Sequence, residues 1–166
     1  MKNFEVKARI NDIARYETIC KQIGAQHVSK MRQIDTYFHV PLGRLKLREA
    51  DKKEGELIYY RRQEKTNKRW SSYYIAPITD PPTFKELLTK AYGVKIVVDK
   101  KRLLYQYKNA RIHLDLVKNL GSFIEIEVVV KKSMVQARVL MKLLLLNLHL
   151  PEKNFIKESY SDLLNK

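Results

Sequence analysis

Apolar and polar residues alternate at the start of the chain. From Lys2 to Ile10 the even positions are mostly apolar, and the odd positions are polar or charged. Because successive side chains of a β-strand point to opposite faces, this period of two predicts a strand with one apolar face. Asn11 and Asp12 can cap a following helix, and apolar residues then recur at helical spacing until Gly24.

Seven further segments have the pattern of strands and are separated by turn residues. They are residues 27–40, 44–49, 56–62, 70–76, 94–107, 111–117 and 122–130. A short helix is predicted before residues 94–107, where Thr83 and Glu86 stand at capping-box spacing. Ser133 can cap a last long helix that runs to about Leu148, and a short amphipathic piece follows around Tyr160.

The order of these elements predicts the fold class. One strand, a helix, four strands, a helix, three strands and a helix favour an α+β fold, in which helices pack outside an antiparallel sheet. Eight strands are enough to close a β-barrel. Because the 166 residues contain no linker, low-complexity stretch or internal repeat, we expect a single domain over residues 1–166.

Ionisable residues gather on one face of every strand with a clear pattern. Alternation assigns to this face the cations Lys7, Arg9, Arg44, Lys46, Arg48, Lys100, Arg102 and Arg111, either Arg61 or Arg62 from residues 56–62, His113, and the carboxylates Glu5, Asp115, Glu125 and Glu127. A half-exposed sheet with a charged solvent face is one explanation. The carboxylates, however, fall on the first and the last two strands, whereas cations occur on nearly all of them. This separation of charge favours an enclosed face with a binding function.

The net charge narrows the choice of partner. The chain has 33 Lys and Arg against 18 Asp and Glu, so its formal charge is +15. Such a charge attracts anions, which include nucleic acid, an anionic membrane surface and polyphosphates. An enclosed face with more cations than carboxylates would be unfavourable when empty, because buried charge needs compensation. A bound metal polyphosphate would supply that compensation.

The carboxylates suggest a metal site. Glu125 and Glu127 lie on one face of one strand, and Asp115 on the preceding strand can face them. Mg²⁺ takes oxygen ligands, typically one or two carboxylates with waters and phosphate oxygens. Ion pairing to neighbouring arginines is the alternative explanation for these three residues.

Two classes of protein are disfavoured. Cys20 is the only cysteine, which excludes an intrachain disulfide and a cysteine-rich metal site. The longest apolar run, around residues 143–146, is far shorter than the roughly 20 residues of a membrane-spanning helix. We therefore expect a cytoplasmic protein that has no membrane partner.

Six segments together resemble one known family. They are Asn3-Phe4-Glu5-Val6-Lys7, Asp35-Thr36-Tyr37-Phe38, Gly43-Arg44-Leu45-Lys46-Leu47-Arg48, Lys100-Lys101-Arg102, Arg111-Ile112-His113-Leu114-Asp115 and Gly121-Ser122-Phe123-Ile124-Glu125-Ile126-Glu127. In this order they resemble the CYTH family, or triphosphate tunnel metalloenzymes, which includes class IV adenylate cyclases, thiamine triphosphatases and inorganic triphosphatases. The resemblance covers about residues 2–130.

The resemblance implies a fold and a site. The fold is an eight-stranded antiparallel β-barrel that forms a triphosphate tunnel, with helices packed outside. By position, the implied ligands of Mg²⁺ or Mn²⁺ are Glu5, Asp115, Glu125 and Glu127. The implied phosphate-binding residues are Lys7, Lys46, Arg48, Arg61, Lys100, Arg102 and Arg111. This chain departs from the family at its first hallmark glutamate, which is Asn3 here.

The resemblance leaves the reaction open. A triphosphate substrate, such as ATP, thiamine triphosphate or inorganic triphosphate, could be hydrolysed, or ATP could be cyclised to cyclic AMP with release of pyrophosphate. Lys7, with a pKa lowered by cationic neighbours, is a candidate catalytic base, and His113 is another. A plain hydrogen-bonding role for His113 is the alternative.

Two other functions compete with an enzyme. A non-catalytic binder of polyphosphate or nucleotide is favoured by Asn3. Nucleic-acid binding would suit the positive charge and Trp70, which could stack on bases, but no motif of a known nucleic-acid-binding module is present. A homodimer is compatible with the sequence.

Overall fold

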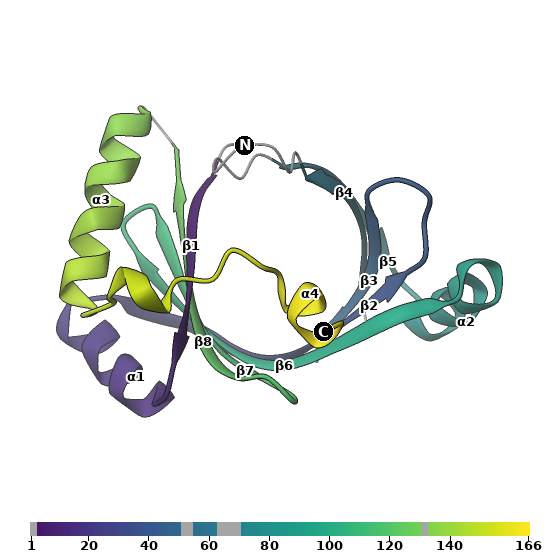
Figure 1. The fold of residues 1–166 in the computed structure, drawn as a ribbon, viewed down its shortest axis with the longest axis horizontal. Coiled ribbons are helices and arrows are strands. Elements are labelled where there is room, and N and C mark those ends of the chain that lie inside the picture. Colours follow the sequence, from purple (N-terminus) through teal and green to yellow (C-terminus); the bar gives the residue numbers. More distant parts are fainter. Residues whose placement is uncertain (1–2, 51–54, 63–70, 131–132) are drawn as a thin grey trace. The chain divides into compact units, whose positions relative to one another are not determined.

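A computed structural model describes residues 3–50, 55–62, 71–130 and 133–166 (Figure 1). The strands are β1 (Asn3–Ile10), β2 (Gln26–Phe38), β3 (Arg44–Ala50), β4 (Gly55–Arg62), β5 (Ser71–Ile78), β6 (Val94–Tyr107), β7 (Ala110–Val117) and β8 (Gly121–Val129). The helices are α1 (Ile13–Gln22), α2 (Pro81–Tyr92), α3 (Met134–Asn147) and α4 (Tyr160–Leu164), with a 3₁₀ turn at Glu152–Asn154. Trp70 lies outside the described residues.

All eight strands belong to one sheet. Their order is β1-β8-β7-β6-β2-β3-β4-β5, and the ladders β1–β8, β7–β8, β2–β3, β3–β4 and β4–β5 are antiparallel. The predicted α+β class with eight antiparallel strands is confirmed. Among the described residues the order ends at β1 and at β5, so closure into a tunnel is not part of the hydrogen bonding and stays a prediction.

The chain forms two compact units. The first comprises Met1–Lys30 and Lys101–Glu158, and the second comprises Met31–Lys100 and Ser159–Lys166. The single domain expected from the sequence stays a prediction beside this division. None of the helices in the described ranges is long and apolar enough to cross a bilayer.

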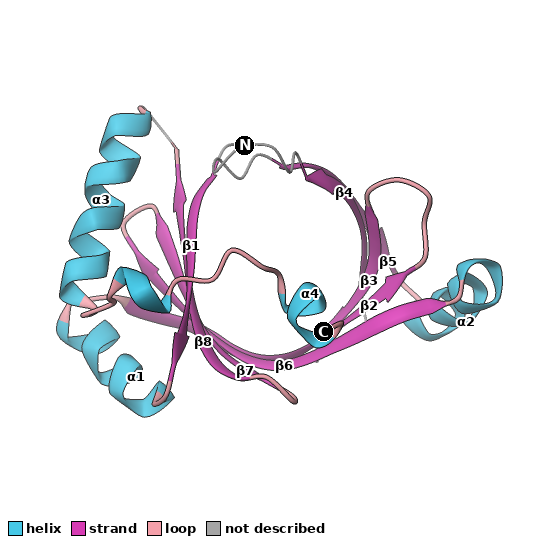
Figure 2. Cartoon of the chain, in the orientation of Figure 1, coloured by secondary structure: helices cyan, strands magenta, loops and turns pink. Residues whose placement is uncertain are grey.

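The core of the first unit lies on the apolar face of β1, β7 and β8. Helices α1 and α3 lie together along this part of the sheet (Figure 2). Buried residues of the strands include Ile112, Ile124 and Ile126, and they form one cluster with Met141 and Leu144 of α3. Because most even positions of these strands are buried or pack against this cluster, the odd positions are left for the other face.

The core of the second unit is smaller. Phe38 of β2, Leu47 of β3, Ile78 of β5 and Leu88 of α2 form a buried cluster. Leu45 also packs against the cluster, and because Leu45 and Leu47 are two residues apart in β3, they lie on the same face. The even positions of β3 therefore point to the opposite, polar face.

The helix starts follow local capping chemistry. The side chain of Asp12 accepts a hydrogen bond from the backbone N–H of Arg15, so the predicted cap of α1 is confirmed. The predicted cap of α2 at Thr83 is wrong, because Asp80 accepts from the N–H of Thr83 and α2 begins at Pro81. Proline suits the first helical position, where its missing N–H costs no hydrogen bond.

We expect Ser133→Ala to destabilise the protein by about 1 kcal/mol. The Ser133 hydroxyl accepts a hydrogen bond from the N–H of Gln136 at 3.2 Å and so caps α3. Urea unfolding monitored by circular dichroism measures the loss. Ser133→Asn keeps an accepting oxygen and should retain most of the stability. Equal losses in both variants would contradict a capping role.

Candidate functional site

The strand register of the first unit places charged residues opposite one another. In the β1–β8 ladder Glu5 pairs with Glu127 and Lys7 pairs with Glu125. In the β7–β8 ladder Arg111 pairs with Glu127 and His113 pairs with Glu125. Directly paired residues share a face of the sheet. The alternation in the sequence thus predicted correctly that these six residues lie on one face.

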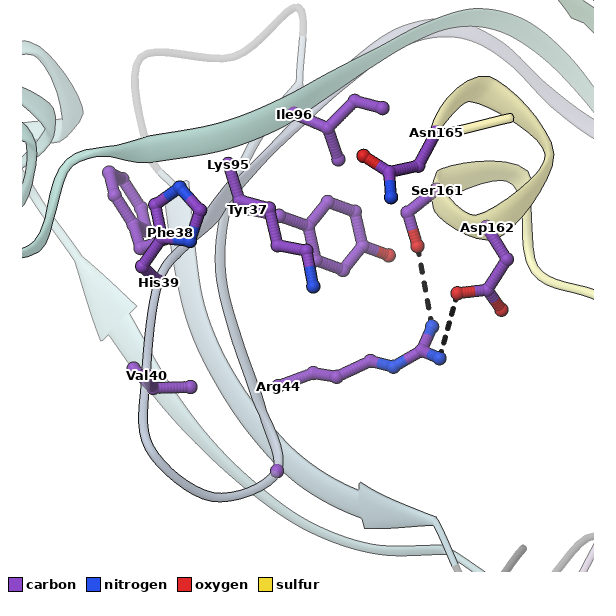
Figure 3. A pocket seen from close by; sticks show the side chains of 11 residues that line it. Tyr37, Phe38, His39, Val40, Arg44, Lys95, Ile96, Ser161, Asp162 and Asn165 are labelled. Atoms are coloured by element: carbon purple, nitrogen blue, oxygen red, sulfur yellow. Dashed lines mark hydrogen bonds and ion pairs between the residues drawn. The ribbon is translucent and has the colours of Figure 1, made fainter.

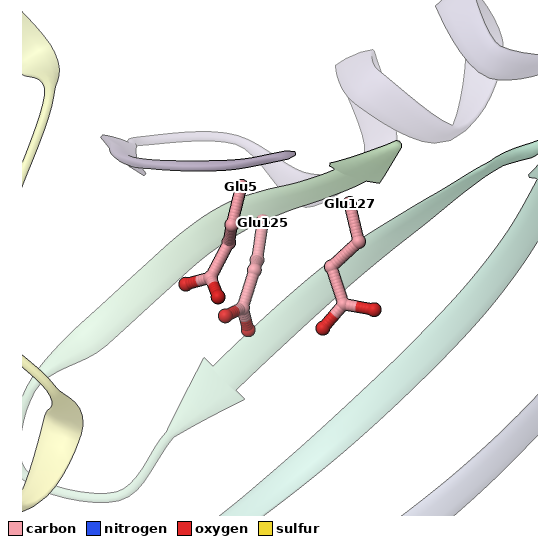
Figure 4. Close-up of side chains that lie close together, drawn as sticks. All are labelled: Glu5, Glu125 and Glu127. Carbon is pink, nitrogen blue, oxygen red and sulfur yellow. The ribbon is translucent and has the colours of Figure 1, made fainter. Parts of the chain in front are cut away.

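Three glutamates of this face form a group that could hold a cation. Ligand oxygens of Glu5, Glu125 and Glu127 all lie within 4.8 Å of one another (Figure 4). The three side chains are partly buried. Carboxylate oxygens at this spacing can converge on a hard divalent ion such as Mg²⁺ or Mn²⁺.

Cations flank the glutamates. Lys7 Nζ lies 3.8 Å from Glu125 Oε1, and Arg102 Nη2 lies 2.9 Å from Glu125 Oε2. Arg111 Nη2 lies 2.6 Å from Glu127 Oε2. Burial alone would raise the pKa of Glu125, but the positive charges of Lys7 and Arg102 outweigh it and hold that pKa well below its usual range. Glu125 is therefore ionised at neutral pH, as a metal ligand must be.

The structure does not bring Asp115 into the glutamate group, although we expected it there as a metal ligand. Asp115 is fully buried and accepts two hydrogen bonds of 2.6 Å from the guanidinium of Arg102. The register explains the difference, because Asp115 pairs with Phe123, which lies two residues along β8 from Glu125 on the same face. Its contacts are those of an anchor for Arg102.

His113 lies beside the same group. Its side chain is 8% exposed, and Nδ1 lies 4.0 Å from Glu125 Oε2. This distance is too long for a hydrogen bond, and Nδ1 has no hydrogen-bond partner among the described residues. The predicted catalytic roles of His113 and Lys7 stay predictions.

The second unit holds a group of cations around one carboxylate. Lys46 Nζ donates to Asp35 Oδ2 at 2.8 Å, and Arg48 donates to both oxygens of Asp35 at 2.8 and 3.1 Å. Lys100 Nζ lies 3.4 Å from Asp35 Oδ2. Asp35, Lys46 and Lys100 are each less than a tenth exposed. We call these four residues the Asp35 group.

The ionisation of the Asp35 group follows from its contacts. Burial would raise the pKa of Asp35, but Lys46, Lys100 and Arg48 together hold it well below its usual range. Burial lowers the pKa of Lys46, and the negative charge of Asp35 opposes that effect. The group thus carries three cations against one anion when Lys46 is protonated.

Arg61 is not brought together with Lys46 and Arg48. The β3–β4 register pairs Lys46 with Ile58 and Arg48 with Glu56, so even positions of β4 share the polar face. Arg61 is exposed and occupies an odd position of β4, so it lies on the other face of the strand. Residues 57–60 are apolar or aromatic at every position, so alternation could not define the faces of this strand.

Helix α4 and Asp35 have no role predicted from the sequence. Arg44 donates to Ser159 Oγ at 2.8 Å, and its Nη2 lies 2.8 Å from Asp162 Oδ1. Arg44 and Asp162, with Tyr37 and Lys95, line a pocket of about 90 Å³ (Figure 3). An amphipathic pattern around residue 160 predicted a helix here, but no local signal indicated which strand it would contact.

Acid should weaken the Asp35 group. Because the pKa of Asp35 is lower in the folded than in the unfolded protein, its carboxylate contributes stability above the unfolded value, and that contribution is lost as the pH falls toward the folded value. We therefore expect the free energy of unfolding to decrease between about pH 5 and pH 2. Asp35→Asn should flatten this decrease in urea unfolding curves measured across that range. An unchanged pH dependence in the variant would show that other carboxylates carry it.

Comparisons with known proteins agree with this fold. A family model described as the CYTH domain matches residues 1–160. A protein from Pyrococcus horikoshii has a TM-score of 0.86 and 24% identity, over 97% of this chain and 98% of its own. A candidate adenylate cyclase from Vibrio parahaemolyticus has a TM-score of 0.80 and 21% identity, over 100% and 99%.

A more distant structure has a described activity. It is a candidate adenylyl cyclase from Hippeastrum, described as having a dominant triphosphatase activity, with a TM-score of 0.73 and 14% identity over 98% of this chain and 94% of its own. At these identities the solved structures show a common fold. No curated protein matches the sequence at a significant level.

Proposed function

This chain belongs to the CYTH family, and on that premise we propose that it is a divalent-metal-dependent enzyme that acts on a triphosphate-bearing small molecule. The observation that carries the proposal is the group of Glu5, Glu125 and Glu127, whose oxygens lie within 4.8 Å of one another beside Lys7 and Arg102. Carboxylates and cations in one partly buried group suit a metal ion together with an anionic ligand.

The donor set fits the metal expected from the sequence. All three ligands are carboxylates, which suit Mg²⁺ or Mn²⁺ better than the softer metals that favour thiolate or imidazole. When bound, such an ion supplies positive charge that neutralises phosphate oxygens. We leave Asp115 out of the proposed metal ligands, because both of its oxygens accept hydrogen bonds from Arg102.

The basic residues would bind the substrate. Phosphoryl transfer is catalysed mainly by positioning and by stabilisation of negative charge. Lys46, Arg48 and Lys100 of the Asp35 group offer three cationic donors, and Arg102 and Arg111 add two guanidinium groups to the first unit. We retain these five residues and Lys7 as phosphate-binding residues in the proposal and leave out Arg61.

The reaction is either hydrolysis or cyclisation. In hydrolysis, water attacks the terminal phosphorus, the bond to the bridging oxygen breaks, and the diphosphate part of the substrate leaves, which gives inorganic phosphate. In cyclisation, the ribose 3′-hydroxyl of ATP attacks the α-phosphorus, and pyrophosphate leaves. Either attack needs a group that accepts the proton of the nucleophile. Lys7, whose Nζ lies 3.8 Å from Glu125, and the buried His113 are the two candidates.

One feature favours a second function, non-catalytic binding. Asn3 stands in β1 directly opposite Val129, at the position where the family hallmark has its first glutamate. An amide lacks the charge of a carboxylate and would weaken a second metal site. A protein of this kind would bind a polyphosphate or nucleotide without converting it.

A substrate panel distinguishes these functions. The protein is incubated with ATP, thiamine triphosphate or inorganic triphosphate, each with Mg²⁺ or Mn²⁺, and the release of phosphate, pyrophosphate and cyclic AMP is measured. Metal-dependent turnover of at least one substrate is expected. Tight binding without turnover would favour the binder, and absence of both would overturn the proposal. Cytoplasmic location and a homodimer stay predictions.

A further inference from the structure

One buried carboxylate is the common contact of three cations that come from two strands. Asp35 lies on β2 and is 2% exposed. The β2–β3 register pairs it with Arg48, and Lys46 lies two positions away on the same face of β3. Lys100, on β6, contacts the same oxygen of Asp35 as Lys46 does. The three cations therefore share Asp35 as an acceptor.

Bringing several lysine and arginine side chains close together is energetically unfavourable when no anion lies between them. Each has many rotamers, and fixing one side chain costs up to about 2 kcal/mol of conformational entropy. Their like charges also repel one another. A shared anion removes both obstacles, because the cations are ordered before any ligand arrives. Preorganised groups bind a ligand more tightly, since the entropy has already been lost.

We propose that Asp35 is a positioning residue that orders Lys46, Arg48 and Lys100 for binding the phosphate chain of the substrate. The inference rests on the proposed function, because it assigns these cations to a triphosphate ligand. Asp35 itself is an anion and would not contact a phosphate oxygen. It acts through the three cations, and both of its oxygens are already engaged by them.

If net charge alone determined how tightly a phosphate binds, removing the Asp35 carboxylate would strengthen binding instead of weakening it. The Asp35 group has a net charge of +2 from three cations and one carboxylate. Asp35→Asn raises this to +3, so simple attraction would strengthen the binding of an anion. If Asp35 positions the cations, the same substitution weakens binding, because they spread apart and regain their rotamers. The sign of the change therefore separates the two explanations.

The test is calorimetric titration with inorganic triphosphate in the presence of a chelator, so that no metal-dependent turnover occurs. We expect Asp35→Asn to raise the dissociation constant by about 10- to 100-fold, the usual effect of losing hydrogen bonds to a charged group. Asp99→Asn is the matched control, because Asp99 also accepts a bidentate arginine, Arg32, but at the surface. It should bind as the wild type does.

A second variant tests the inference in case Asp35→Asn does not fold. Asp35→Glu keeps the negative charge but moves the carboxylate by one methylene group, so it should fold and still bind more weakly than the wild type. Wild-type binding by Asp35→Glu, or unchanged or tighter binding by a folded Asp35→Asn, would overturn the inference. If the wild type bound no triphosphate, with chelator or with Mg²⁺, the proposed function itself would fail first.

A double-mutant cycle tests whether Asp35 acts through Lys46. Lys46→Gln alone should weaken triphosphate binding, because a cationic donor is lost. Adding Asp35→Asn to Lys46→Gln should then weaken binding by less than Asp35→Asn does in the wild type, since one of the positioned cations is already missing. Additive effects would show that Asp35 and Lys46 act independently, which contradicts a positioning role.

Discussion

Replacing Glu127 with glutamine should lower kcat/KM for the proposed triphosphate substrate by on the order of 10²- to 10³-fold. The substitution keeps the size of the side chain and removes one of the three carboxylates that could hold the metal. It should also raise the Mg²⁺ or Mn²⁺ concentration needed for half-maximal activity, because fewer anionic ligands bind the ion more weakly. Steady-state rates measured over a range of metal concentrations would show both effects.

The fold should tolerate this substitution. Glu127 pairs with Arg111, whose side chain is 42% exposed, so water can solvate the guanidinium once the carboxylate is gone. Glu86→Gln is the matched control, because Glu86 is an exposed residue of α2 that pairs with Lys90. Its kinetics should equal those of the wild type. Similar losses in the two variants would count against the glutamate group as the metal site.

Replacing Arg102 with methionine should destabilise the protein by about 3–5 kcal/mol. Arg102 donates to both oxygens of Asp115, which is fully buried, and also to Glu125. Methionine retains much of the aliphatic stem but leaves those carboxylates without their guanidinium. An uncompensated buried charge is strongly unfavourable. Urea unfolding followed by circular dichroism would measure the loss.

The chain contains a matched pair of the same chemistry at its surface. Arg32 makes two hydrogen bonds to Asp99, of 3.0 and 2.7 Å, but its side chain is 55% exposed. Arg32→Met should therefore cost less than about 1 kcal/mol, because water replaces the lost contact. If Arg32→Met and Arg102→Met were equally destabilising, burial of Asp115 would not be the reason for the loss.

Local patterns were enough to predict most of the elements. Alternation from Lys2 to Ile10 depends only on the geometry of a strand, and β1 follows it with its odd positions on the polar face. The caps at Asp12 and Ser133 are also local, because each side chain bonds to a backbone group three residues later. Two adjacent prolines concealed the start of α2, where Asp80 and not Thr83 is the cap.

The face on which a candidate site residue lies was predicted where the alternation was clean and was left undefined where it was not. Glu5, Glu125 and Glu127 lie in strands with one apolar face, and these three of the four expected metal ligands lie close together. Arg61 follows a run of four apolar or aromatic residues, so its face could be read either way from the sequence. The triphosphate nature of the substrate was inferred from the resemblance to a family, because the spacing of residues along the chain does not specify it.

By itself, the sequence determined which side chains of each strand share a face, because that depends on the backbone of one strand alone. Only the tertiary structure decided which residues meet across strands, because register depends on pairing between segments that are distant in the chain. A two-residue offset along β8 places Asp115 opposite Phe123, where it accepts hydrogen bonds from Arg102 and is not part of the glutamate group. In the same way, pairing of β2 with β3 makes Asp35 the shared acceptor for Lys46 and Arg48.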